Sequence, residues 1–143
     1  MPELDRGTKI YAALLGALIL GLVFVALYEP PQVSRLNDRL EADEQVGGFP
    51  YAFRVLRISN GVAVMSTPRS SAVPVARVLD KIFPGVGNSA PDAPLFQEMQ
   101  AKLADTQKRA KAIVMEDPEV ERVQWELDRD WLMQHGINPL DTP

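Results

Sequence analysis

The chain has 143 residues, a formal net charge of −4 and no cysteine. The acidic balance argues against binding to nucleic acid or to anionic lipid, because both select basic protein surfaces. The lack of cysteine excludes disulfides, thiolate metal ligands and a thiol nucleophile. A chain of this length predicts one small folded domain.

The most informative segment is Ile10–Tyr28, nineteen consecutive residues without a charged or strongly polar side chain. A helix needs about 20 apolar residues to cross the hydrocarbon core of a bilayer. We therefore predict a transmembrane anchor over 10–28, preceded by a short N-terminal tail, 1–9.

A cleaved signal peptide is the first alternative for this segment. Such peptides have a basic start, a shorter apolar core and small residues before the cleavage site. Here Arg6 and Lys9 are balanced by Glu3 and Asp5, and no small-x-small pair precedes Glu29. The pattern therefore favours an uncleaved anchor.

Orientation is predicted from the basic residues that flank the span. Arg6 and Lys9 precede it, and Arg35 and Arg39 follow within eleven residues. The first pair adjoins the membrane, and the N-terminal amine adds positive charge on the same side, which the positive-inside rule assigns to the cytoplasm. We expect a single-pass protein of the plasma (inner) membrane, with the C-terminal domain outside.

The segment that follows the span ends the membrane helix at Pro30-Pro31, because proline cannot continue a helix. Apolar residues then recur at helical spacing among acidic ones. We predict an acidic juxtamembrane stalk over 29–48, with a short helix that docks on the domain or on a partner as the alternative. The apolar positions are Val33, Leu36 and Leu40.

A small domain is predicted over 49–138, followed by a C-terminal tail, 139–143. Its clearest local signal is Asn60-Gly61 between the apolar runs 51–59 and 62–67. Asn-Gly suits a two-residue hairpin turn, in which both central residues need positive φ. The sequence therefore predicts a β-hairpin at the start of the domain.

Two helices are expected next. Ser70 or Ser71 is expected to cap the first, with Pro74 in its first turn. The second follows Pro94 and places the basic run Lys108-Arg109-Lys111 outward.

The segment 118–128 fits either a helix or a strand. Read with a period of two, its apolar residues share one face, whereas on a helix Trp125 points away from the apolar stripe. We therefore predict a third strand, and a short last helix capped by Asp128 and ended by Gly136, a residue suited to the left-handed C-terminal cap.

The predicted fold class is a single N-terminal transmembrane α-helix followed by a small α+β domain. The domain has the order β-β-α-α-β-α: a β-hairpin, two helices, a third strand and a short C-terminal helix. If 118–128 were helical, the domain would be a hairpin with a helical bundle.

One candidate binding site lies at the junction between the second strand and the following helix. Hydroxyls, backbone amides and an arginine at a helix N-terminus suit an anion. The junction lacks the glycine-rich loop and lysine of a phosphate cradle, and ordinary helix capping is the alternative. The residues are Ser66, Thr67, Arg69, Ser70 and Ser71.

We predict no catalytic, metal or cofactor site. His135 is the only histidine, which excludes paired-histidine metal sites, and its place at a helix C-terminus has a structural explanation. The acids of 116–130 match no calcium loop and are interpreted as a solvated or partner-facing surface. An enzyme would need its catalytic acids among Glu116, Asp117, Glu119, Glu121, Glu126, Asp128 and Asp130.

The aromatic residues of the domain are predicted to fill the core and cover the sheet, with an exposed platform for a glycan or peptide as the alternative. They are Phe49, Tyr51, Phe53, Trp125 and Trp131.

The leading functional expectation is a membrane-anchored, non-catalytic protein whose domain mediates protein–protein interaction, as an accessory or assembly subunit of a membrane or envelope complex. The expected partners are the bilayer, through Ile10–Tyr28, and another protein or a second copy. The alternative is a membrane-tethered module that binds a small anionic ligand at 66–71.

Overall fold

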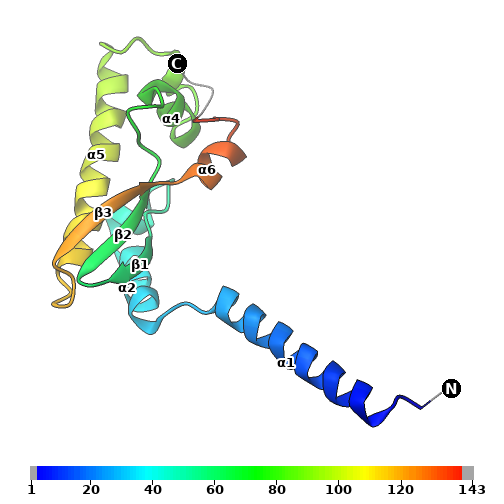
Figure 1. Cartoon of the computed structure of the whole chain (residues 1–143). Coiled ribbons are helices and arrows are strands. Elements are labelled where there is room, and N and C mark those ends of the chain that lie inside the picture. The colour runs from blue at the N-terminus through cyan, green and yellow to red at the C-terminus, as the bar shows by residue number, and fades with distance from the viewer. Residues whose placement is uncertain (1–2, 140–143) are drawn as a thin grey trace. The chain divides into compact units, whose positions relative to one another are not determined.

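The computed structural model describes residues 3–139. The chain divides into two compact units, one up to Pro30 and one from Pro31 onward, shown in Figure 1. The two ends of the predicted tails, residues 1–2 and 140–143, lie outside the described residues.

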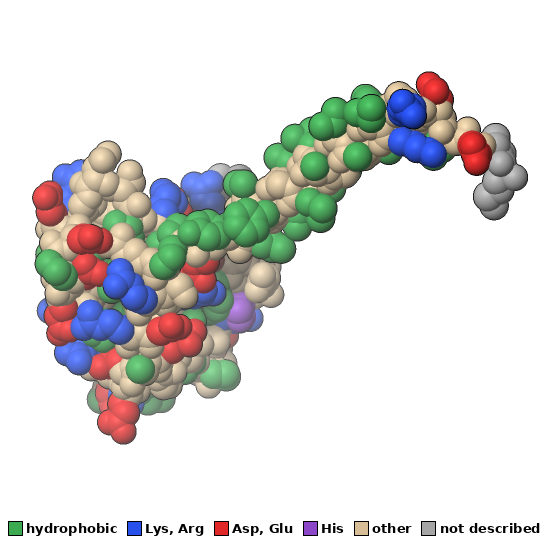
Figure 2. Space-filling view, turned by 90° about the horizontal axis from the view of Figure 1, so that it is seen from below, with side chains coloured by type: hydrophobic (Ala, Val, Ile, Leu, Met, Phe, Trp, Pro, Cys, Tyr) green, Lys and Arg blue, Asp and Glu red, His purple; other side chains and the backbone are tan. Residues whose placement is uncertain are grey.

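The first unit is built around helix α1, Arg6–Leu27, with 22 residues and no buried side chain. At 1.5 Å per residue it is about 33 Å long. Hydrophobic side chains line α1 in the face seen in Figure 2. Near the N-terminus, the described residues therefore include one helix long and apolar enough to cross a membrane. The predicted apolar helix is confirmed, while its placement in a bilayer stays a prediction.

The second unit is a three-stranded sheet with helices, as predicted. From the hairpin onward, the elements follow the expected order β-β-α-α-β-α, with a short 3-10 helix, η1, added between the two middle helices. The elements are α2 Pro31–Ala42, α3 Glu44–Gly47, β1 Val55–Ser59, β2 Val62–Thr67, α4 Val75–Ile82, η1 Val86–Asn88, α5 Pro94–Met115, β3 Arg122–Leu127 and α6 Arg129–Gln134.

Strand β2 is the centre of the sheet, antiparallel to β1 and parallel to β3. The hairpin turn has φ of 51° at Asn60 and 79° at Gly61, the positive values that this residue pair was predicted to supply. The prediction that 118–128 contains a strand is also confirmed. In β3, Trp125 lies opposite Met65 in the register with β2.

The sheet packs on helices through one buried face, and its other face is exposed at the outer strands, although Val64 and Ser66 of β2 are buried there. On the buried face, Ala63 and Met65 of β2 have no exposed surface, and helices α2 and α5 lie on this side (Figure 1). On the exposed face, Arg57 of β1 donates to Glu126 of β3 at 3.0 Å. This ion pair therefore joins the two outer strands across β2.

Helix α2 corrects the expectation of a stalk over 29–48. Val33, Leu36 and Leu40 are 3%, 1% and 1% exposed, and α2 packs on β1 and α5. The apolar stripe was identified in the sequence, but its burial partner is the domain itself. From Pro31 onward the segment thus belongs to the folded unit, as in the docked-helix alternative.

Asn37 of α2 holds the start of strand β1. Its Oδ1 accepts from the Val55 backbone N–H at 2.7 Å, and its Nδ2 donates to the Val55 carbonyl oxygen at 3.1 Å. Asn37 and Val55 are both buried. The side-chain amide therefore takes the place that a neighbouring strand would have at this position.

Helix capping agrees with the predictions at α6 and differs at α4. Asp128 Oδ1 accepts from the Trp131 N–H at 3.1 Å, and Gly136 has φ of 74°. Helix α4, however, begins only after Pro74, with no side-chain cap. The Ser70 hydroxyl instead accepts from the Ala72 N–H at 3.1 Å, because serine readily closes such a local turn.

The aromatic residues form a chain of ring contacts in and beside the core. Tyr51 lies 4.9 Å from Phe53 and 5.3 Å from Trp131, measured between ring centroids, and Phe53 lies 6.2 Å from Trp125. The Tyr51 hydroxyl donates to Asp128 Oδ2 at 2.8 Å. Burial, together with the nearby carboxylate, raises the pKa of Tyr51, so the hydroxyl stays protonated and able to donate.

Candidate functional site

The predicted site residues at the end of β2 separate into buried and exposed groups. Ser66 and Thr67 are 3% and 4% exposed. The Ser66 hydroxyl oxygen accepts from the Arg54 N–H at 3.3 Å. The Thr67 hydroxyl donates to Gln107 Oε1 at 3.0 Å and its oxygen accepts from the Arg69 N–H at 3.2 Å. Both hydroxyls therefore bond within the fold.

The remaining predicted residues lie at the surface, ahead of helix α4. Ser71 and Arg69 are exposed, and α4 begins several residues later, at Val75. The junction therefore does not place these residues on a helix N-terminus. A ligand contact at 66–71 stays a prediction. Among these residues, Arg69 also lines a pocket.

Arg69 lines a pocket of about 260 Å³ between helix α5 and strand β3. Helix α5 contributes residues at positions i, i+3, i+4 and i+7, which share one face of a helix. Trp125 of β3 forms another part of the lining. The bonds from Arg69 to Thr67 and from Thr67 to Gln107 attach the Arg69 turn to α5. The α5 residues are Ala104, Gln107, Lys108 and Lys111.

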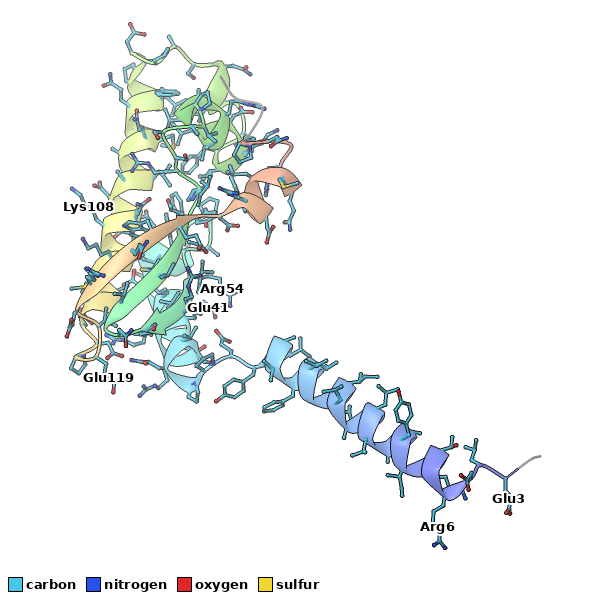
Figure 3. The ribbon with its side chains drawn as sticks, viewed as in Figure 1. Glu3, Arg6, Glu41, Arg54, Lys108 and Glu119 are labelled. Atoms are coloured by element: carbon cyan, nitrogen blue, oxygen red, sulfur yellow. The ribbon has the colours of Figure 1, made fainter. Side chains whose placement is uncertain are left out.

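The pocket is cationic. Arg69, Lys108 and Lys111 line it, and none of its lining residues within the described part of the chain is a carboxylate. Lys108 extends from the side of α5 (Figure 3). None of these three cations belongs to an ion pair among residues 3–139, where the pairs are Arg39–Glu116, Arg57–Glu126 and Arg109–Asp43.

The three basic residues of the run in α5 therefore have two roles, an ion pair for one and the pocket lining for the other two. Arg109 donates to Asp43 Oδ1 at 2.9 Å. This hydrogen bond holds the pKa of Asp43 below its ordinary value of 3.8. Lys108 and Lys111 instead face the pocket.

A second pocket, of about 390 Å³, differs in its electrostatics. It is lined by residues of both charge signs, including Glu44, Lys102 and Asp105, so its lining has no single-sign preference for a ligand. The smaller pocket at Trp125 is therefore the better candidate for selective binding.

The chemistry of the Trp125 pocket favours an anion. Lysine ammonium groups act as point charges, and a guanidinium presents a planar fork that matches a carboxylate or phosphate. Trp125 adds an apolar wall that is half buried against the core. The arrangement can therefore hold an anionic group with an apolar neighbour.

The open edge of β3 adjoins this pocket. The N–H groups of Arg122 and Asp128 donate inward, to the carbonyls of Gly61 at 3.2 Å and Thr67 at 2.8 Å. Because main-chain groups alternate in direction along a strand, those of Val123, Trp125 and Leu127 point to the outer edge. Within the described part of the chain, β3 pairs with β2 alone. Trp125 therefore belongs both to the pocket and to the open edge.

Several acids of 116–130, and His135, have structural contacts. Glu116 pairs with Arg39, and Glu119 accepts from Gln32 at 2.6 Å. The His135 ring lies 4.2 Å from the Trp131 ring. Residues 3–139 contain no group of three or more histidine, aspartate or glutamate residues arranged to hold a metal ion.

Sequence reasoning missed the cationic pocket. Lys108 and Lys111 were recognised as an outward basic run, and Arg69 as a candidate ligand, but separately. Their meeting at Trp125 depends on the connection from β2 through α5 to the parallel strand β3.

Comparisons with protein-family models, with curated proteins and with solved structures found no match to this chain.

Proposed function

We propose that this chain is a single-pass membrane protein, with a cytoplasmic N-terminus, whose folded unit lies outside and binds an acidic segment of a partner protein. In this role it is a non-catalytic accessory or assembly subunit of a membrane or envelope complex. The observation that carries the proposal is the convergence of Arg69, Lys108 and Lys111 on Trp125, without a lining carboxylate, in a chain of net charge −4.

The properties of α1 support the anchor. From Ile10 onward the helix is apolar around its whole circumference, and it has no buried residue. A helix of this kind needs an apolar surrounding, and its apolar part, residues 10–27, is about 27 Å long, close to the thickness of about 30 Å of a hydrocarbon core. Arg6 and Lys9, at its N-terminal end, support the proposed orientation.

The position of the pocket supports a protein partner over a free small ligand. Sites for small molecules enclose most of the ligand surface, whereas this pocket opens beside an unpaired strand edge. The alternative of a small anion held at 66–71 is left with Arg69 and Ser71 as exposed groups, because the hydroxyls of Ser66, Thr67 and Ser70 bond within the fold.

Photo-crosslinking in membranes tests the proposal. A photoreactive residue in place of Lys108, in the full chain, is expected to give a protein adduct that survives gentle detergent extraction. The matched control carries the same group at Lys81, an exposed lysine of α4. Arg69→Glu combined with the Lys108 probe is expected to reduce the adduct, and so is added salt, which screens exposed charges.

Recovery of the monomer alone from both probes would contradict the proposal. Equal adducts from Lys81 and Lys108, insensitive to Arg69→Glu, would contradict it as well, because contact would then not depend on the cationic pocket.

A further inference from the structure

We infer that the acidic partner segment binds as an additional β-strand on the open edge of β3, so that its acidic side chains reach Arg69, Lys108 and Lys111. This inference rests on the proposed function and adds to it the binding mode and the sequence pattern of the partner.

Strand β3 has main-chain hydrogen-bonding groups along its outer edge. Strand β3 has six residues, and the main-chain groups of Val123, Trp125 and Leu127 point away from β2. Regular spacing of these groups along about 13 Å is what a short extended peptide needs to form a ladder. The edge can therefore bind a strand through main-chain atoms.

Sheet geometry determines where the side chains of an added strand would lie. A new strand would run about 4.8 Å from β3, with alternate side chains on the two faces of the sheet. One set would lie on the same face as the Trp125 side chain, which lines the pocket with Lys108 and Lys111. Acidic residues two positions apart share a face, so the predicted partner pattern is acidic-x-acidic in an extended segment without proline.

A second copy of this chain is the alternative occupant of the β3 edge. Two β3 edges paired with each other would bring together two sets of Arg69, Lys108 and Lys111, all of positive charge. Juxtaposed like charges oppose association. Charge complementarity therefore favours an acidic segment of a different protein.

The test uses the full chain in detergent micelles and a labelled, end-blocked peptide, Thr-Glu-Val-Glu-Val-Glu-Thr. Fluorescence anisotropy measures its Kd, and the matching peptide with glutamine in place of glutamate is the charge control. We expect the glutamate peptide to bind at least about tenfold more tightly. Lys108→Glu is expected to remove this preference, whereas Lys102→Glu, on another part of the same helix, is expected to retain it.

Two N-methylated peptides separate strand addition from charge attraction alone. One carries N-methyl groups on the three glutamates, and the other carries them on the intervening valines and the last threonine. Because the N–H groups of a strand alternate in direction, only one set faces β3. One peptide is expected to lose at least about tenfold in affinity relative to the other, and the amides of Val123, Trp125 and Leu127 are expected to exchange more slowly in the complex.

The outcomes are distinguishable. Charge-dependent binding with equal effects of the two methylation patterns and unchanged exchange at β3 would overturn strand addition and leave the proposed function standing. Equal binding of the glutamate and glutamine peptides would overturn both. Slower exchange at β3 that depends on protein concentration without peptide would show pairing between copies and overturn the acidic partner.

Discussion

The two edges of the small sheet differ in how their outward main-chain groups are bonded. At the β1 edge, the buried Asn37 side chain satisfies both main-chain groups of Val55, and α2 packs alongside. At the β3 edge, the outward main-chain groups of Val123, Trp125 and Leu127 adjoin a cationic pocket. Exposed edges invite pairing with other chains, and folded proteins usually block them. One edge is thus closed at Val55 by the domain itself, while the other has the features of a binding edge.

The largest expected effect comes from truncating the helix that closes the β1 edge. Leu40→Ala removes a side chain that is 1% exposed, and the lost burial with the cavity left behind should lower the free energy of unfolding by about 3 kcal/mol. Urea unfolding followed by tryptophan fluorescence measures this, because both tryptophans lie in the folded unit.

The control for that substitution is Leu95→Ala in α5, where the side chain is 50% exposed and the expected loss is much smaller. Equal stabilities of the two variants would mean that α2 behaves as an undocked stalk and that the β1 edge is open in solution.

The next largest effect is expected from removing the hydrogen bonds between Asn37 and Val55 at the β1 edge. Asn37→Ala leaves the buried N–H and carbonyl of Val55 without the hydrogen bonds measured at 2.7 and 3.1 Å. Unsatisfied buried polar groups should lower the free energy of unfolding by about 2 kcal/mol. Hydrogen exchange should become faster at the Val55 amide, with Asn88→Ala, at an exposed site, as the control for stability.

Asn37→Ala is expected to change exchange at the Val55 amide without changing it at the Gln124 amide, which alternates with Val123 and points inward to β2. Equal acceleration at both amides would show that the two edges open together and that they do not differ locally.

A smaller effect is expected at the hydrogen bond between Tyr51 and Asp128, residues that flank the two outer strands. Tyr51 lies just before β1, Asp128 follows β3, and the hydroxyl–carboxylate distance is 2.8 Å. Tyr51→Phe removes this hydrogen bond while keeping the ring contacts, so the free energy of unfolding should fall by about 1 kcal/mol. A double-mutant cycle with Asp128→Asn measures the coupling, and additive losses would show that the bond contributes no stability of its own.

Local signals in the sequence predicted local structure well. Asn60-Gly61 predicted the hairpin because few residue pairs accept two positive φ values. The alternation around Trp125 predicted β3, and Asp128 predicted the start of α6. Each of these depends on residues close together in the chain.

Long-range structure was predicted less well. The apolar stripe of α2 indicated a helix but not what buries it, because a docked helix and a stalk that binds a partner need the same spacing. Ser70 or Ser71 was expected to cap α4, although the Ser70 hydroxyl also suits the local turn that it forms. The cationic pocket unites Arg69, Lys108 and Trp125, which are distant in sequence, so no local pattern could predict it.

The smallest expected effect concerns the ion pair that links the two edges across the exposed face. Arg57 and Glu126 have side chains that are 59% and 47% exposed, and such exposed pairs contribute little to stability. The hydrogen bond from Arg57 holds the pKa of Glu126 below its ordinary value of 4.5. Since the carboxyl binds its proton less tightly in the folded state, the contribution is present above that value and is lost as the pH falls below it.

Arg57→Ala should therefore reduce stability at neutral pH by less than Tyr51→Phe does, with no reduction well below pH 4.5 or at high salt. Arg54→Ala, an exposed arginine of the segment before β1, is the control, and urea unfolding across pH measures both. A loss that persisted in acid would assign the effect to the packing of the Arg57 stem over β2 instead of to its charge. The ion pair would then add nothing to the attachment of β3 beyond its ladder with β2, and the two edges would be distinguished by their main-chain groups alone, which are bonded to Asn37 at Val55 and point outward at Val123, Trp125 and Leu127.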